Sequence, residues 1–188
     1  EKTYFSKLCL VQISGPGIDP TIIDPLDKQT DMNPLIDALY DEDVVNVLHS
    51  GYQDLEFFYH LYGKVPAPIF DTQVAASVLG YGDQVSYANL AKDICGVEIS
   101  KSQQFTDWSR RPLSDGQIQY ALGDVIYLDE IYPTLKKQLE ERNRKSWIEE
   151  DIKALEDKDT YHIYPEKAWE KIKIRSDKPK HLGVLQKI

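Results

Sequence analysis

The chain has 188 residues, of which 41% are hydrophobic, so it is long enough for one domain with a sizeable core and too short for two full domains. Charged residues make up 28% and aromatic residues 11%, which excludes an intrinsically disordered chain. The formal net charge of −9 argues against sequence-independent duplex binding through a broad basic face.

The first half of the chain alternates extended and helical patterns. Apolar runs predict strands at residues 8–13, 21–24 and 44–48 and a brief extended piece at 66–70. The short connection at Gly15-Pro-Gly17 predicts that the first two strands pair antiparallel. Apolar residues at helical spacing predict helices at 34–39, 55–62, 74–79 and 86–94. Asp71 is the expected cap of the third of these helices.

The second half is predicted to be helical. Ser114 and Gln117 fit a capping box, which opens a long helix whose apolar stripe runs from Ile118 to Leu139. Another amphipathic helix is predicted at 147–155, and a short basic helix begins at Pro165. Because strands come first, then strand–helix alternation and then helices, the sequence predicts an α/β fold with a mixed sheet flanked by helices.

The charge balance changes near residue 158, where we place a boundary. Residues 1–159 contain fifteen Lys and Arg against twenty-eight Asp and Glu, whereas residues 160–188 contain seven against three. Any contact between nucleic acid and the main body therefore requires metal ions or local basic clusters.

The two cysteines and the hydropathy pattern indicate a cytoplasmic protein. Cys9 and Cys95 sit in apolar contexts without metal-ligand spacing, which is typical of buried free thiols in a reducing compartment. No apolar segment is long enough for a membrane span and no signal-peptide pattern is present, so we expect no membrane association.

Carboxylates are the side chains best placed for chemistry. The four His form no His-x-x-x-His or Cys/His cluster, and there is no P-loop, nucleophile elbow or dinucleotide fingerprint. Asp54 starts the helix after the strand at 44–48 and points away from its apolar stripe, beside the carboxyl end of a strand. The alternative is that Asp54 is an acidic first-turn residue favoured by the helix dipole.

Tyr120 and Asp124 form a second candidate pair. Their i,i+4 spacing stacks a phenol and a carboxylate on one helix face. A carboxylate binds a hard cation, while the phenol, with a reference pKa of about 10, stays neutral at pH 7 and orients a water molecule that the cation activates. The alternative is a solvated Tyr–Asp helix face.

Four segments together resemble the ribonuclease D family in order and spacing. They are His49-Ser-Gly-Tyr-Gln-Asp54-Leu-Glu, Asp71-Thr-Gln, Thr106-Asp-Trp-Ser-Arg-Arg-Pro-Leu113 and Gln119-Tyr-Ala-Leu-Gly-Asp124-Val-Ile-Tyr-Leu128. That family belongs to the DEDD 3′–5′ exonucleases, in the subgroup whose third motif carries Tyr, and the resemblance covers nearly the whole chain. It implies an RNase H-like exonuclease domain over residues 1–158, followed over 159–188 by a linker and the start of a helicase-and-RNase-D C-terminal helical domain.

The resemblance also implies a two-metal mechanism with Mg²⁺ or Mn²⁺. Asp54 matches the Asp of the family's second motif, and Tyr120 and Asp124 match the Tyr and Asp of its third. All three are implied to be catalytic, with Asp54 and Asp124 as metal ligands. The other two ligands belong to an Asp-Thr-Glu motif on the family's first strand. By extrapolation from Lys2-Thr-Tyr, we expect that motif just upstream of Glu1, in a segment that the working protein contains.

Four further residues are weaker nucleic-acid-binding candidates. His49 stands beside the second motif, either as a contact to a terminal nucleotide or as a structural His at a strand end. Trp108, Arg110 and Arg111 precede the third-motif helix, where the guanidiniums hold phosphates or, alternatively, a packed Trp lies between solvated arginines.

By family resemblance we expect the partner to be RNA with a free 3′ end, such as a tRNA precursor, and the product to be nucleoside 5′-monophosphates. No obligate protein partner is evident. One alternative is a DNA-directed exonuclease of the same superfamily, because the contacts that read the 2′-OH are not visible in the sequence. Another is a noncatalytic RNA-binding or scaffold module without the first motif.

Overall fold

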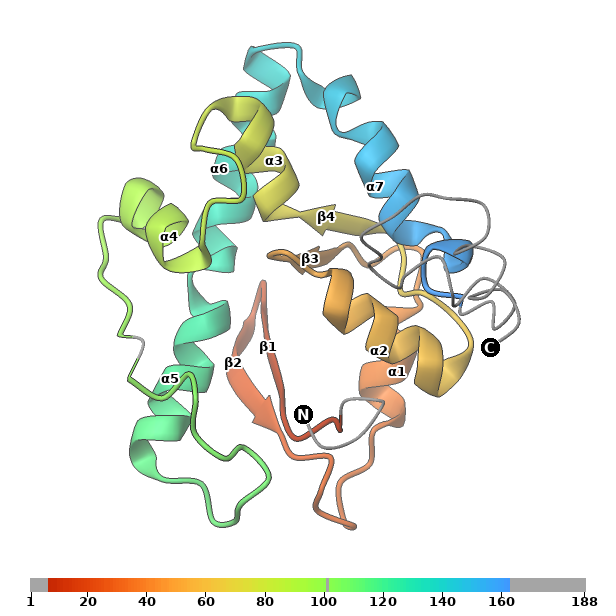
Figure 1. The fold of residues 1–188 in the computed structure, drawn as a ribbon, viewed down its shortest axis with the longest axis vertical. Coiled ribbons are helices and arrows are strands. Elements are labelled where there is room, and N and C mark those ends of the chain that lie inside the picture. Colours follow the sequence, from red (N-terminus) through yellow and green to blue (C-terminus); the bar gives the residue numbers. More distant parts are fainter. Residues whose placement is uncertain (1–6, 101, 163–188) are drawn as a thin grey trace, which may run out of the picture.

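The computed structural model describes residues 7–100 and 102–162 (Figure 1). The strands are β1 (Val11–Gly15), β2 (Ile18–Ile23), β3 (Asn46–Leu48) and β4 (Ile69–Asp71). The α-helices are α1 (Asn33–Leu39), α2 (Tyr52–Tyr62), α3 (Thr72–Leu79), α4 (Tyr87–Cys95), α5 (Asp115–Ile126), α6 (Leu128–Glu141) and α7 (Glu149–Glu156). Two short 3₁₀ helices, η1 (Lys145–Trp147) and η2 (Lys158–Thr160), flank α7. None of the helices in these ranges is long and apolar enough to cross a membrane.

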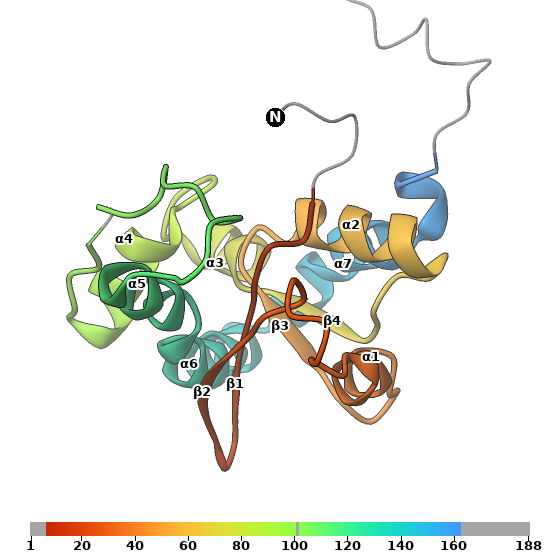
Figure 2. The same ribbon diagram turned by 90° about the horizontal axis from the view of Figure 1, so that it is seen from below.

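The strands form two separate pairs. β1 and β2 are antiparallel, as predicted, with Val11 opposite Ile23, and β3 and β4 are parallel, with Leu48 opposite Asp71. Both pairing types of the predicted mixed sheet therefore occur. They lie in two separate two-stranded sheets, and no ladder joins these sheets within the described residues. They lie between α3, α4, α5 and α6 on one side and α1, α2 and α7 on the other (Figures 1 and 2).

The core lies between α3, α4 and α6. The predicted apolar stripe of the C-terminal half supplies Ile131, Leu135 and Leu139, each at most 2% exposed. They belong to one cluster with Ala75, Ala76, Leu79, Val85, Leu90, Ala91 and Ile148. Burying an aliphatic side chain of this size stabilises the fold by about 1.5–3 kcal/mol, so this cluster anchors the helices that flank β4.

The predicted long helix is broken into α5 and α6 at Tyr127. Its amide donates to the Tyr87 hydroxyl at 3.3 Å. The Val125 carbonyl, which a continuous helix would pair with the amide of Asp129, accepts instead from the Ser14 hydroxyl at 3.0 Å. Pro133 follows in α6 and has no N–H to give to the helix. The prediction of one helix was wrong because side chains from β1 and α4 take the backbone groups at the break.

The strand predicted at 44–48 begins later than expected. Val44 and Val45 are 40% and 44% exposed, and the ladder with β4 starts at Asn46. The Asn46 side chain donates to the Leu39 carbonyl at 3.0 Å, which joins the start of β3 to the end of α1. The apolar pair before β3 is therefore a surface feature within the described residues.

The packed body extends past the boundary predicted near residue 158. Tyr161 is 2% exposed, packs with Leu55 and Ile69, and donates its hydroxyl to the Leu155 carbonyl at 2.6 Å. The division into a domain at 1–158 and a second unit at 159–188 remains a prediction, since residues 163–188, including the basic helix expected at Pro165, lie outside the described residues.

One buried carboxylate joins the turns that follow β3 and β4. Asp71 is 2% exposed and, as predicted, caps α3 by accepting from the amides of Gln73 (2.8 Å) and Val74 (3.3 Å). It also accepts from the amides of Ser50 (3.1 Å) and Gly51 (2.8 Å), at the start of α2. The first turns of two helices are thus held by one side chain, which satisfies amides that helix termini leave unpaired.

Gly51 is required by the close packing of this turn. A Cβ at position 51 would lie 2.6 Å from Cδ1 and 2.8 Å from Cβ of Leu48, closer than such atoms can approach. The preceding Ser50 has a left-handed backbone with φ +57°. The β3–α2 turn is therefore tight, and Asp71 fixes it from the neighbouring strand.

We expect Asp71→Ala to lower the free energy of unfolding by about 3 kcal/mol, because several buried amides lose a charged acceptor. The matched control is Asp31→Ala, which removes an exposed carboxylate that accepts from one backbone amide, that of Asn33, among the described residues. The control should cost no more than about 1 kcal/mol. Urea denaturation of both variants measures the difference, and equal losses would show that Asp71 does not join the two turns.

Candidate active site

Asp54, Tyr120 and Asp124 line one cavity of about 400 Å³. The cavity lies between α2, α5 and the residues that lead into β1, with Gln53, Phe57 and Phe58 on the α2 side. The three predicted catalytic residues, which are far apart along the chain, are therefore brought together by the fold.

Asp54 reaches the cavity because α2 buries its opposite face. Leu55 is 1% exposed and Phe58 is 9% exposed, both packed inward, while Asp54 lies in the first turn with an exposed side chain. The protein mass around the cavity raises the pKa of Asp54, and the nearby charge of Asp71 raises it further. The N-terminal position is also favourable for an acidic residue, so the alternative of a first-turn dipole interaction holds together with a place in the cavity.

Asp124 and Tyr120 project from α5, which the predicted capping box of Ser114 and Gln117 opens. Both side chains are half-buried. Burial raises the pKa of Asp124 to about 6. The pKa of Tyr120 is raised by burial and then by the charge of Asp124, so the phenol is neutral at pH 7. A carboxylate and a hydrogen-bonding phenol thus face the same space.

The donor set fits a hard divalent cation, although the described residues supply only part of a site. Carboxylate oxygens suit Mg²⁺, and both carboxylates have raised pKa values, so each pays an ionisation cost that a bound cation would offset. Within residues 7–100 and 102–162, no group of three or more His, Cys, Asp and Glu side chains is placed to hold a metal. The two carboxylates of the expected Asp-Thr-Glu motif would lie upstream of residue 1 and stay a prediction.

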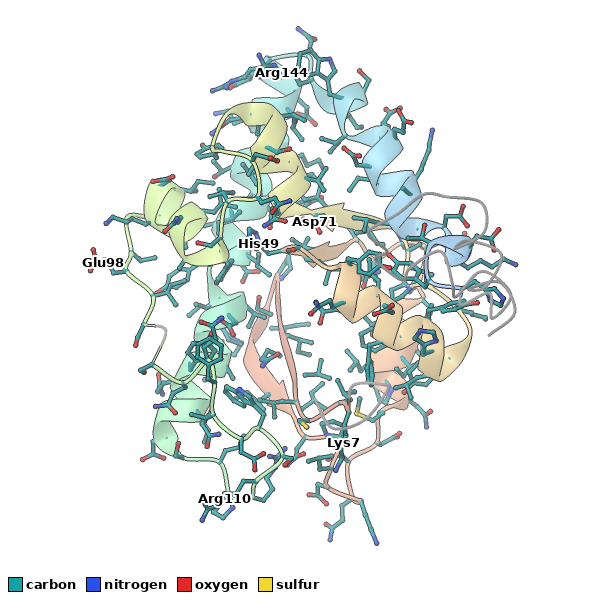
Figure 3. The ribbon with its side chains drawn as sticks, in the orientation of Figure 1. Lys7, His49, Asp71, Glu98, Arg110 and Arg144 are labelled. Carbon is teal, nitrogen blue, oxygen red and sulfur yellow. The ribbon has the colours of Figure 1, made fainter. Side chains whose placement is uncertain are left out.

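His49 is engaged by the protein on both ring nitrogens. Nδ1 lies 2.9 Å from the Thr72 hydroxyl and Nε2 lies 3.0 Å from the Val85 carbonyl, to which it can only donate. Burial lowers the pKa of His49. The ring lies near the carboxyl ends of β3 and β4, beside Asp71 (Figure 3), and does not line the cavity. This geometry favours the structural alternative that the sequence left open.

Arg111 joins segments of the protein as a structural clamp, and its role in holding phosphates stays a prediction. Its Nη2 donates to a carboxylate oxygen of Asp24 and to the Cys9 carbonyl, both at 2.7 Å. Nε bonds the other Asp24 oxygen, and Nη1 donates to the Trp108 carbonyl at 2.9 Å. The guanidinium hydrogen bond holds the pKa of Asp24 below its usual range. Arg111 thus joins the start of β1, the end of β2 and the loop before α5.

Trp108 and Arg110 differ from Arg111. Trp108 is half-buried, lines the cavity and lies with its ring centroid 5.9 Å from that of Tyr120, at an interplanar angle of 43°. Arg110 is exposed at the edge of the molecule (Figure 3). Trp108 therefore packs against the candidate phenol, whereas of the two arginines Arg110 is the one at the surface.

Sequence reasoning missed three features of the site. It assigned Asp71 to the α3 cap but not to the turn that carries Asp54, because that link joins residues of two different strand–helix units. It did not identify the Arg111–Asp24 pair for the same reason. It also did not single out Gln53 and Gln104, which line the cavity next to predicted motif residues.

Comparison with known proteins gives consistent matches. Residues 1–140 match the family described as 3′-5′ exonuclease. Ribonuclease D of Jannaschia sp. (strain CCS1) is 47% identical over 191 aligned residues that cover all of this chain and 50% of that protein. The chain thus spans about half the length of this curated relative.

Two solved structures extend the comparison. The crystal structure of Escherichia coli RNase D, described as an exoribonuclease involved in structured RNA processing, matches with a TM-score of 0.83 and 32% identity, covering 91% of this chain and 45% of that one. Brucella melitensis NrnC with bound Mg²⁺ matches with a TM-score of 0.71 and 29% identity, covering 90% of this chain and 81% of that one.

Because the pKa of Asp124 is raised, replacing its carboxylate should increase the free energy of unfolding by an amount that depends on pH. The native state holds this proton up to about pH 6, whereas the unfolded chain releases it near pH 4, so the native state loses stability as pH rises through that window. We expect Asp124→Asn to raise the free energy of unfolding of the metal-free protein by about 1–2 kcal/mol at pH 8 and by much less at pH 4. Urea titrations at both pH values in EDTA measure it.

The control is Asp93→Asn, which changes an exposed carboxylate on α4 outside the cavity. It should show no such difference between the two pH values. A gain for Asp124→Asn that is equal at pH 4 and pH 8 would contradict the buried-carboxylate explanation.

Substitution of the two adjacent arginines should have different effects on the free energy of unfolding. Arg111→Ala leaves the Asp24 carboxylate and three backbone carbonyls without this donor, so we expect a loss of about 2 kcal/mol. Arg110→Ala should change the free energy of unfolding by about 0.5 kcal/mol or less, as is usual for exposed positions. Thermal melts of both variants test this, and similar melting temperatures would contradict the clamp.

Proposed function

Because the chain belongs to the 3′–5′ exonuclease family, we propose that it hydrolyses RNA from the 3′ end and releases nucleoside 5′-monophosphates one at a time. The observation that carries this proposal is the convergence of Asp54, Tyr120 and Asp124 on one cavity. Relatives named ribonuclease D support RNA as the substrate class, and structured RNA such as tRNA precursors is the proposed substrate. The free thiols of Cys9 and Cys95 suit action in the cytoplasm.

In the proposed mechanism, Asp54 and Asp124 hold two divalent cations, together with the carboxylates expected upstream of residue 1. Mg²⁺ or Mn²⁺ bound there would neutralise phosphate charge and lower the pKa of the attacking water. The relative with bound Mg²⁺ supports this choice of cation. Both Asp side chains must be ionised to bind, so protons compete with the cation, and at subsaturating cation concentration activity should fall as the pH drops below the raised metal-free pKa of Asp124, about 6.

Tyr120 orients the attacking water in this proposal. A phenol with its ordinary pKa of about 10 is already neutral at pH 7, and the pKa of Tyr120 is raised further, so it acts as a hydrogen-bonding group and not as the base. The ring of Trp108 packs beside it and restricts its movement. The chain's own residues thus place the water and the cations, and cation binding lets an acidic body accept a polyanionic substrate.

A noncatalytic RNA-binding module is the second candidate. The observation that favours it is the incomplete ligand set, since no three-ligand group is present in the described part of the chain. Residues 1–188 and a version extended at the N-terminus should both be incubated with Mn²⁺ and single strands labelled at the 3′ nucleotide. We expect the extended version to release labelled 5′-monophosphate from RNA. If neither version cuts while both bind RNA, the noncatalytic function is correct, and equal cutting of DNA would indicate a DNA-directed exonuclease.

In any active version, Asp124→Asn should abolish cleavage with little change in RNA affinity, and Tyr120→Phe should slow cleavage about 100-fold with metal affinity nearly intact. Single-turnover rates and calorimetric Mn²⁺ titrations measure the two effects. Asp115→Asn, an exposed position in the first turn of the same helix, is the control and should keep normal turnover. Unchanged turnover in Asp124→Asn would remove Asp124 from the site, and loss of Mn²⁺ binding in Tyr120→Phe would contradict the water-orienting role.

A further inference from the structure

Phe105 exposes its ring almost completely to solvent. At 94% it is the most exposed of the large hydrophobic residues in the described part of the chain, and it lies in the loop between α4 and α5. Burying a Phe side chain is favourable by about 1.5–3 kcal/mol, which this position gives up. An exposed aromatic ring at a fixed point of the surface suggests contact with a partner.

The backbone around Phe105 is held in place by hydrogen bonds. The amide and the hydroxyl of Thr106 both donate to the Gln103 carbonyl, at 3.1 and 2.9 Å. The buried Gln117 of α5 donates from Nε2 to the Thr106 hydroxyl at 3.2 Å. The turn that presents Phe105 is therefore attached to the helix that carries Tyr120 and Asp124.

The loop that carries Phe105 borders the candidate active site. Gln104, which precedes Phe105, and Trp108, which follows it by three residues, both line the cavity of Asp54 and Asp124. The ring of Trp108 packs against Tyr120 inside the cavity. Phe105 does not line the cavity, and its ring is exposed to solvent. A strand that enters the cavity with its 3′ end would have its next nucleotides beside this loop.

The charge of the chain indicates what kind of contact the loop makes. Residues 1–159 are strongly acidic, so a groove that follows the phosphate backbone through many Lys and Arg is not available there. In the same loop Arg111 is engaged with Asp24. An aromatic ring can bind any unpaired base through its π-face without a basic surface. We infer that Phe105 is a stacking residue for an unpaired nucleobase of the RNA, close to the 3′ end that enters the cavity.

This inference rests on the proposed function, so its test uses binding as well as cleavage. The complete protein is titrated in EDTA against single-stranded RNA that carries 2-aminopurine at one of the four nucleotides nearest the 3′ end. We expect quenching at one of these positions with the wild type and with Phe105→Trp, and none with Phe105→Leu, which keeps apolar bulk without an aromatic face. Phe105→Leu should also bind about tenfold more weakly.

The control variant is Trp147→Ala, which removes another exposed aromatic ring, 60% exposed and packed on Arg144 at the opposite end of the molecule from Arg110 (Figure 3). It should leave both quenching and affinity unchanged. The control RNA has an abasic site at the quenched position, and with it the wild type should lose the advantage over Phe105→Leu.

Equal affinity of the wild type and Phe105→Leu for the intact RNA would overturn the inference. It would also be overturned if Phe105→Leu bound the abasic RNA more weakly than the wild type by the same factor as the intact RNA. With Mn²⁺, Phe105→Leu should raise KM about tenfold and keep kcat within about twofold. Quenching without cleavage would uphold the stacking role and contradict the exonuclease. Cleavage with a KM that does not depend on Phe105 would contradict the stacking role alone.

Discussion

The carboxylate of Asp71 binds four backbone amides, two at the turn into α2 and two at the start of α3. β3 and β4 run parallel, and each leads directly into a helix, so this one side chain sets the start of both helices relative to the strands. Asp54 lies in the first turn of α2 and takes its position from that arrangement. The charge of Asp71 also makes ionisation of Asp54 more costly. The group that positions the candidate ligand therefore also increases its need for a cation.

The net negative charge of the chain is unfavourable for binding a polyanionic substrate at this site. The body is acidic, and desolvation by the surrounding protein raises the pKa values of both cavity carboxylates, which are the conditions in which a bound cation gives the largest electrostatic gain. A phosphate would be repelled by most of this surface and attracted at the cation site, so binding at a strand's end is favoured over binding along its length. Base stacking beside the cavity adds affinity that does not depend on basic residues.

Local signals in the sequence predicted much of this molecule. The ribonuclease D resemblance and the RNase H-like α/β fold are confirmed by the matches to known proteins. Capping residues at Asp71 and Ser114 started their helices where expected, because a cap acts within three residues. The failures involve partners that are distant in sequence. The helix break at Tyr127 depends on side chains of β1 and α4, and Arg111 binds Asp24, which no local pattern reveals.

The central claim is that Asp54 and Asp124 share cations in one cavity although they belong to different helices. The most direct test is a crystal of the complete protein soaked in Mn²⁺, with diffraction recorded to locate the manganese by its anomalous scattering. The account predicts a strong anomalous peak in contact with carboxylate oxygens of both residues, with the Tyr120 hydroxyl facing it. Manganese bound elsewhere, with these two carboxylates free of metal, would contradict it.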